Sequence, residues 1–216
     1  MNVTAPAHEL RDWIADHLDP LHDHAVEGGL RRSDFDLSPG GWADASAGPP
    51  KPAAVLIGLV ERDHGLNVLL TRRSDTMRSH TGQVALPGGR QDEGEQPWET
   101  ALREAHEEVG LEPHFVSLIG LSTPYHTGSG YLITPVVGFV RPGFSLTPNP
   151  DEVADIFETP FGYLMDPANY QEHERTMPTG ETRRFYATTH ETQYIWGATA
   201  GILRALHERL YGATLA

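Results

Sequence analysis

The stretch GGRQDEGEQPWETALREAHEEVGL, from Gly88 to Leu111, carries seven carboxylate side chains. Carboxylates at this density repel one another unless cations neutralise them, so their spacing decides whether they face solvent or a metal. Glu104 and Glu108 are four residues apart, and Glu107 is three residues from Glu104. On a helix, this spacing puts three carboxylates on one face, within reach of a common ion. The pattern therefore predicts a metal site with oxygen ligands.

Residues that favour helix boundaries mark both ends of this helix. Pro97 suits a first helical position and Gly110 suits the left-handed residue that closes a helix, so we expect a helix over residues 97–109. An apolar stripe at helical spacing would pack the helix on a core and direct the carboxylates outward. The stripe consists of Trp98, Ala101, Leu102, Ala105 and Val109. Packing of this stripe would hold the carboxylates in a rigid geometry.

The turn that precedes the helix has little side-chain bulk. Pro87, Gly88 and Gly89 would allow backbone amides and carbonyls to approach a ligand or an ion closely. Glu95 adds another carboxylate from the loop. We therefore expect the two glycines to contact a bound substrate.

These residues form a longer pattern. Gly89 is followed after five residues by Glu95, and after seven more by REAHEEVGL at residues 103–111. The pattern resembles the Nudix box, and its one departure is Ala105, where the family usually has a larger aliphatic residue. The resemblance implies a Nudix-type α/β/α sandwich, with a mixed sheet between helices, and a metal-dependent hydrolase.

The expected metal ligands follow from the helix face. Glu104 and Glu108 are the expected primary ligands because they stack one turn apart, and Glu107 and the Gly89 carbonyl would complete the site. Hydrolysis also needs a general base that activates water. Glu107 or a carboxylate outside the box, such as Glu152, could serve, and sequence spacing does not rank the two.

Arg103 is expected to orient the carboxylates. At four residues' distance it can pair with Glu107 or Glu99 and hold them charged and fixed, as the Nudix pattern implies. Together with Glu95, Arg103 and Glu107 are our candidates for catalytic residues.

Composition narrows the class of protein and of metal. A chain of 216 residues with 38% hydrophobic content fits one folded unit. Because the chain has no cysteine, oxygen and imidazole are the available ligands, and Mg²⁺ or Mn²⁺ fits best. A net charge of −14 disfavours nucleic acid and membrane surfaces as partners. With neither a membrane span nor signal-peptide features in the sequence, we expect a cytoplasmic protein, and homo-oligomerisation stays open.

Apolar runs and turn residues predict the other elements. We expect an N-terminal helix and irregular lead-in over residues 1–52, packed on a Nudix domain over 53–216. Strands are expected at 53–60, 67–73, 83–86, 115–122, 131–140, 153–160 and 182–188. Helical segments are expected at 7–18 and 161–164, and a helix or a strand-to-helix run at 194–211. Pro135 would mark a bulge or a sheet edge, and Trp196 is expected to pack in the core. Strands, helix, strands and helix in this order suggest a mixed sheet between helices.

A second motif precedes the first. Residues 69–89 read LLTRRSDTMRSHTGQVALPGG, which resembles the coenzyme A diphosphatase signature of one Nudix branch, with Leu86 where that signature has phenylalanine. Coenzyme A carries a diphosphate and a separate 3′-phosphate, so its site needs cations beyond the metal, and Arg73 and Arg78 could supply them. In the alternative, these arginines only pair with nearby carboxylates.

The two resemblances imply a small-molecule substrate and a reaction. We expect hydrolysis of coenzyme A to 3′,5′-ADP and 4′-phosphopantetheine, and of its thioesters to acyl-phosphopantetheine. Another nucleoside diphosphate derivative, such as ADP-ribose or a dinucleotide, is the alternative substrate. The Nudix fold also serves an isomerase of prenyl diphosphates and non-catalytic sensors. A sensor would be expected to lose box carboxylates, and this chain keeps all of them.

Overall fold

The computed structural model describes residues 7–22, 31–37, 48–74, 82–176, 180 and 182–212. Within these ranges nine strands form one mixed sheet, whose main path runs β1-β7-β8-β2-β3-β4. The strands are β1 Arg32–Ser33, β2 Lys51–Arg62, β3 Gly65–Arg73, β4 Val84–Ala85, β5 Gly88–Arg90, β6 Val116–Leu121, β7 Tyr125–His126, β8 Tyr131–Val140 and β9 Val153–Pro160. β5 pairs with β2, β6 with β8, and β9 with β3. The pairs β2·β8 and β1·β7 are parallel and the others are antiparallel.

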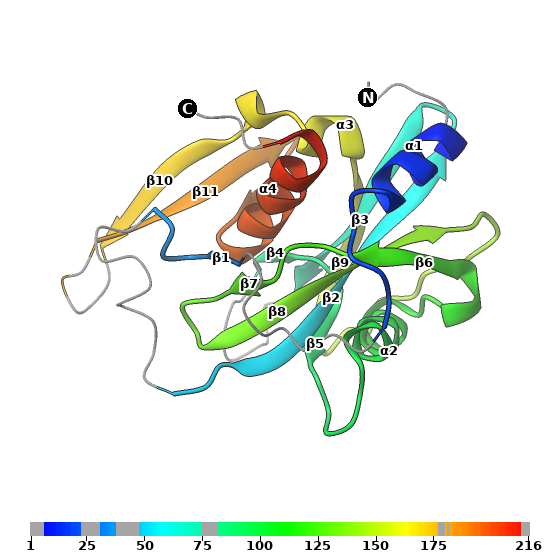
Figure 1. Ribbon diagram of the computed structural model, residues 1–216, viewed down its shortest axis with the longest axis horizontal. Helices are drawn as coiled ribbons and strands as arrows, with labels where there is room; N and C mark the ends of the chain where they lie inside the picture. Colours follow the sequence, from blue (N-terminus) through cyan, green and yellow to red (C-terminus); the bar gives the residue numbers. More distant parts are fainter. Residues whose placement is uncertain are drawn as a thin grey trace.

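Helices cover both faces of this sheet (Figure 1). The helices are α1 Ala7–Ala15, α2 Pro97–Val109, α3 Phe161–Leu164 and α4 Ala198–Tyr211, with short 3₁₀ turns at Pro113–Phe115 and Pro167–Asn169. α1, α3 and α4 contribute to one hydrophobic cluster, and α2 contributes to the other. The expected α/β/α sandwich with a mixed sheet is therefore confirmed.

β2 shows why the sheet is buried on both sides. Residues 53–60 are all buried, and alternate side chains enter different clusters: Leu56 joins the cluster under α2, whereas Ile57 joins the cluster under α4. Because side chains alternate across a strand, a strand covered on both faces needs a continuous apolar run. The run at 53–60 and the hairpin to β3 were both predicted, and both are confirmed.

Pro135 lies in an interior strand, so the expected sheet edge is wrong. β8 pairs with β2 on one side, where Pro135 is opposite Val55. On the other side Pro135 falls between the pairing with β7 and the pairing with β6. There its carbonyl accepts a hydrogen bond from the Ser122 N–H (2.8 Å). A residue without an N–H is tolerated at this point because the neighbouring strand changes.

The N-terminal segment is attached to the sheet more closely than the composition indicated. α1 buries Leu10 and Ile14 completely. Arg209 of α4 donates to the Asp19 carboxylate (2.6 and 3.1 Å), and β1, inside the region expected to be irregular, pairs with β7. This segment therefore supplies a strand and a helix to the fold.

A second sheet follows the first. Its three described strands are β10 Gln171–Thr176, β11 Thr182–His190 and β12 Gln193–Trp196, all antiparallel. The sequence predicted β11 and a strand-to-helix run near β12, and it missed β10, whose side chains are mostly exposed. β10 and β11 extend beside α4 in Figure 1. Of the described helices, none combines the length and apolar character needed to cross a membrane.

Candidate active site

α2 presents its carboxylates from a well-anchored position. The helix spans Pro97–Val109, as predicted, and Gly110 closes it in the left-handed conformation (φ 68°). At the other end the Gln96 N–H donates to the Glu99 carboxylate (2.8 Å), so Glu99 satisfies the helix N-terminus. On the side facing the sheet, the predicted stripe is buried at Ala101, Ala105 and Val109 and partly buried at Trp98 and Leu102.

Glu108 is a buried carboxylate beside the backbone of the glycine turn. Only 4% of the residue is exposed, and the Gly88 N–H donates to its Oε2 (3.2 Å). Burial raises the pKa of Glu108 to about 7, with Glu104 and Glu152 adding repulsion and with Gly88 and Arg73 opposing it. A buried carboxylate in this state is poised to gain a cation.

Glu104 lies against the backbone of the glycine turn. A Cβ atom at Gly89 would come within 2.5 Å of the Glu104 carboxylate, and one at Gly88 would come within 2.4 Å of the Ala54 carbonyl oxygen. Burial is the main cause that raises the pKa of Glu104, and Glu107 and Glu152 add repulsion. The Gly89 backbone therefore lies close to the side chain of an expected metal ligand, and its approach to a bound substrate or ion stays a prediction.

Arg103 gathers three carboxylates around one guanidinium group. It donates to both oxygens of Glu95 (2.8 and 3.0 Å), to Glu104 Oε1 (2.8 Å) and to Glu107 Oε2 (3.0 Å). Of the two pairings expected for Arg103, the one with Glu107 is observed, whereas Glu99 caps the helix instead. Arg103 thereby connects the loop carboxylate to the helix carboxylates.

Glu95 serves this network from the loop. Its hydrogen bonds with Arg103 are the main cause that lowers the pKa of Glu95 to about 2. The Asp92 N–H (3.0 Å) and the Thr100 hydroxyl (2.7 Å) also donate to the Glu95 carboxylate. Glu95 therefore stays ionised and fixes the position of Arg103.

Arg73 brings a positive charge to the same place. It ends β3, where the pairing with β9 shifts register, and its N–H donates to the Gln83 carbonyl (2.9 Å). Its charge lowers the pKa of Glu108. Arg78, the other arginine of the predicted pair, lies outside the described residues.

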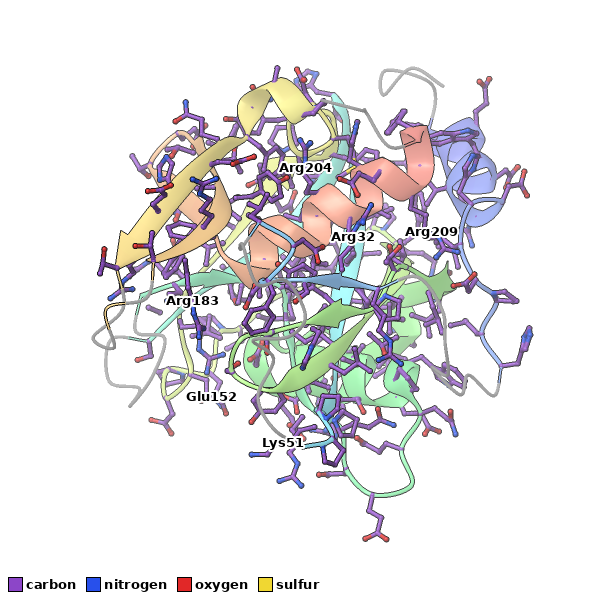
Figure 2. All side chains as sticks on the ribbon, turned by 60° about the vertical axis from the view of Figure 1, so that its left-hand side comes forward. Arg32, Lys51, Glu152, Arg183, Arg204 and Arg209 are labelled. Carbon is purple, nitrogen blue, oxygen red and sulfur yellow. The ribbon has the colours of Figure 1, made fainter. Side chains whose placement is uncertain are left out.

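Glu152 approaches the site from the loop before β9. The Ser74 N–H donates to its backbone carbonyl (2.8 Å), which ties this loop to the end of β3. The charge of Glu152 contributes to the raised pKa of both Glu104 and Glu108. Glu107, the other candidate for the general base, has a side chain that is 52% exposed. Glu152 is labelled in Figure 2. Sequence spacing did not decide between Glu152 and Glu107 as the general base.

The donor set suits a hard divalent cation in its chemistry. In the part of the chain that the structure describes, no three carboxylate or imidazole groups are arranged to hold a metal. Arg103 forms an ion pair with Glu104 (2.8 Å), whereas the Gly88 N–H donates to Glu108. Glu104 and Glu108 nevertheless have raised pKa values and lie beside the backbone of the glycine turn. Buried carboxylate oxygens that repel each other suit Mg²⁺ or Mn²⁺ as ligands.

Known proteins with sequences similar to this chain are Nudix proteins. The NUDIX domain family matches residues 49–180. The uncharacterized Nudix hydrolase NudL of Photorhabdus laumondii is 41% identical over 159 residues, which cover 73% of this chain and 84% of that protein. A protein of the same description from Yersinia pestis is 40% identical over 159 residues, covering 73% and 79%. Among solved structures, the Nudix hydrolase RenU of M. smegmatis has a TM-score of 0.45 and 25% identity, over 54% of this chain and 74% of that chain.

Proposed function

The chain belongs to the Nudix family of hydrolases, which act on diphosphate bonds, and from this premise we propose that its substrate is coenzyme A. Water would cleave the diphosphate bond to give 3′,5′-ADP and 4′-phosphopantetheine. Thioesters of coenzyme A would react in the same way, because the thiol lies far along the molecule from this bond. The residues from 53 to 216 would form the hydrolase domain, on which residues 1–52 pack.

The observation that carries this proposal is the position of Arg73. The charge of Arg73 lowers the pKa of the Glu108 carboxylate, which supports a role of the arginine motif beside the carboxylate helix. A substrate with phosphates beyond the diphosphate would use such a cation in addition to a metal. Arg78 of the same motif would add a second cation.

Each side chain of the site has a proposed task. Glu104 and Glu108 would hold a divalent cation, with Glu107 and the Gly89 carbonyl as further ligands. When bound, this cation would neutralise phosphate charge and ease ionisation of the attacking water. Arg103, held by Glu95, would keep the helix carboxylates ionised and in place until they are needed as ligands.

Glu152 is our choice for the general base. Glu107 is hydrogen bonded to Arg103 and largely exposed, whereas the charge of Glu152 adds to the burial that raises the pKa of Glu104 and of Glu108. A base must lie within reach of the water that attacks next to these carboxylates. Glu152 would accept the proton of that water.

The competing substrate is another nucleoside diphosphate derivative, such as ADP-ribose or a dinucleotide. The family membership and the carboxylate geometry serve either substrate equally well. A comparison of kcat/KM for coenzyme A and ADP-ribose, both with Mg²⁺ and with Mn²⁺, separates them. We expect a preference of at least tenfold for coenzyme A, and a preference for ADP-ribose would transfer the proposal to that substrate.

A further inference from the structure

The second sheet carries four aromatic rings on one face, and nothing in the reaction described so far uses them. Strand register puts His173 opposite Phe185, Trp196 opposite Ala187, and Tyr194 opposite Thr189, so these side chains project from the same side of the sheet. Their ring centroids are 5.1 Å apart for Phe185 and Trp196, 5.9 Å for His173 and Tyr194, and 6.5 Å for Tyr194 and Trp196. We call this side of β10, β11 and β12 the aromatic face.

The aromatic face is also the basic side of the sheet. Arg175 and Arg183 are directly opposite each other across β10 and β11, and alternation puts both on the aromatic face. The acidic residues of β10, Glu172 and Glu174, project from the other side, where Glu174 pairs with Arg184 (2.8 Å). The charge of Arg183 acts on the Asp34 carboxylate, so Arg175, which is exposed, is the cation that this face presents to an anion.

Chain connections put the aromatic face near the glycine turn. β12 packs beside β4, and the Thr199 hydroxyl, just after β12, donates to the Val84 carbonyl (3.0 Å). β4 leads within a few residues to Gly88, whose N–H binds Glu108. A ligand whose scissile diphosphate lies at the carboxylates could therefore extend its nucleoside end toward the rings.

Tyr194 is 40% exposed and is the one exposed large apolar side chain in the described ranges. Its hydroxyl is held by His173 Nδ1 (2.7 Å), so the ring is fixed although it faces solvent. Fixed, exposed rings are suited to stacking on a planar ligand.

We propose that the aromatic face binds the adenine ring of the substrate, with Arg175 facing a phosphate group of the nucleotide. The proposal rests on an adenine nucleotide substrate, which coenzyme A and ADP-ribose both are. The rings provide a surface for the base, and Arg175 provides charge complementarity for the phosphate. Arg183 also stacks on Phe35 (5.6 Å) and acts on Asp34, so Arg175, at the exposed edge, is the cleaner residue to test.

Calorimetric titration of the whole chain with AMP in metal-free buffer tests the aromatic face separately from hydrolysis. Tyr194→Ala should weaken AMP binding about tenfold, because stacking contributes that order of affinity, and should leave binding of ribose 5-phosphate unchanged. Arg175→Gln should weaken both ligands. Arg184→Gln, on the opposite side of the same sheet, is the matched control and should bind AMP as the unaltered chain does.

Several outcomes would overturn the proposal. One is the absence of AMP binding to the unaltered chain, and another is an AMP affinity in Tyr194→Ala and Arg175→Gln equal to that of the unaltered chain. Light scattering on the same samples tests whether a second copy of the chain binds the aromatic face. If Tyr194→Ala dissociates a dimer while AMP affinity is unchanged, the face is an interface between two copies. Failure of coenzyme A cleavage with AMP binding intact would refute the proposed substrate and leave the aromatic face as a nucleotide site.

Discussion

Substitution of Glu108 by glutamine should abolish turnover and yet stabilise the metal-free protein. Glu108 is 4% exposed and has a pKa near 7, against 4.5 for an unperturbed glutamate. At about 1.36 kcal/mol per pKa unit, ionisation of this buried group costs the folded state about 3 kcal/mol. Glutamine removes the charge, and its amide oxygen can still accept the Gly88 N–H.

The size of this stabilisation depends on pH. Below pH 4.5 Glu108 is protonated in both states, so the two proteins should have similar free energies of unfolding. As pH rises from 4.5 to about 7, the unfolded state loses its proton first and the unsubstituted protein loses stability. Above about pH 7 the full difference, up to about 3 kcal/mol in favour of Glu108→Gln, should be reached.

Urea denaturation in EDTA from pH 4 to 8 measures this difference, and turnover with Mg²⁺ measures the lost ligand. We expect turnover to fall by on the order of a hundredfold or more. Glu104→Gln is the companion variant and should lose turnover to the same order. A Glu108→Gln protein less stable than the unsubstituted chain at pH 8 in EDTA would show that the carboxylate supports the fold. Turnover within a few-fold of normal in both variants would refute the ligand assignment.

Three further predictions concern the turn, the arginine and the pH dependence of metal binding. Gly89→Ala should weaken Mn²⁺ binding at least about tenfold with an unchanged circular dichroism spectrum, because the added Cβ displaces the Glu104 carboxylate; unchanged Mn²⁺ affinity in a titration would contradict this. Arg73→Ala should raise KM for coenzyme A about tenfold and KM for ADP-ribose less, since a charge-assisted hydrogen bond contributes about 1.5 to 3 kcal/mol; equal increases would assign Arg73 to the shared diphosphate. Mn²⁺ affinity should fall about tenfold per pH unit below about pH 7, as protonation of Glu108 competes with the metal, and a flat profile from pH 5 to 7 would exclude Glu108 as a ligand.

The sequence predicted those parts of the fold that local patterns determine. The proline and glycine at its ends and the apolar stripe defined α2 to the residue, and the continuous apolar run defined β2. β10 was missed because its residues are polar and exposed, so no apolar alternation marks it. Pro135 was misplaced because its position depends on which neighbouring strand ends beside it, and that is a tertiary property.

The active site also combines features that local sequence predicts with features that depend on tertiary structure. Helical spacing was enough to bring Glu104, Glu107 and Glu108 to one face of α2. The approach of Glu152 could not be derived from spacing, because it depends on pairing of β9 with β3 and on the contact between Ser74 and the loop before β9. The division of Arg103 among three carboxylates depends on a loop conformation that brings Glu95 to the helix. Trp196 was expected in the core, but it is only partly buried, because β12 turns it toward the aromatic face.

The central claim is that this chain cleaves the diphosphate of coenzyme A. Mass spectrometry of the products formed from coenzyme A and Mg²⁺ tests it most directly, with Glu108→Gln as the inactive control. We expect equal amounts of 3′,5′-ADP and 4′-phosphopantetheine from the unaltered chain, and neither product from the control. Release of inorganic phosphate alone, or intact coenzyme A beside rapid cleavage of ADP-ribose under the same conditions, would contradict it.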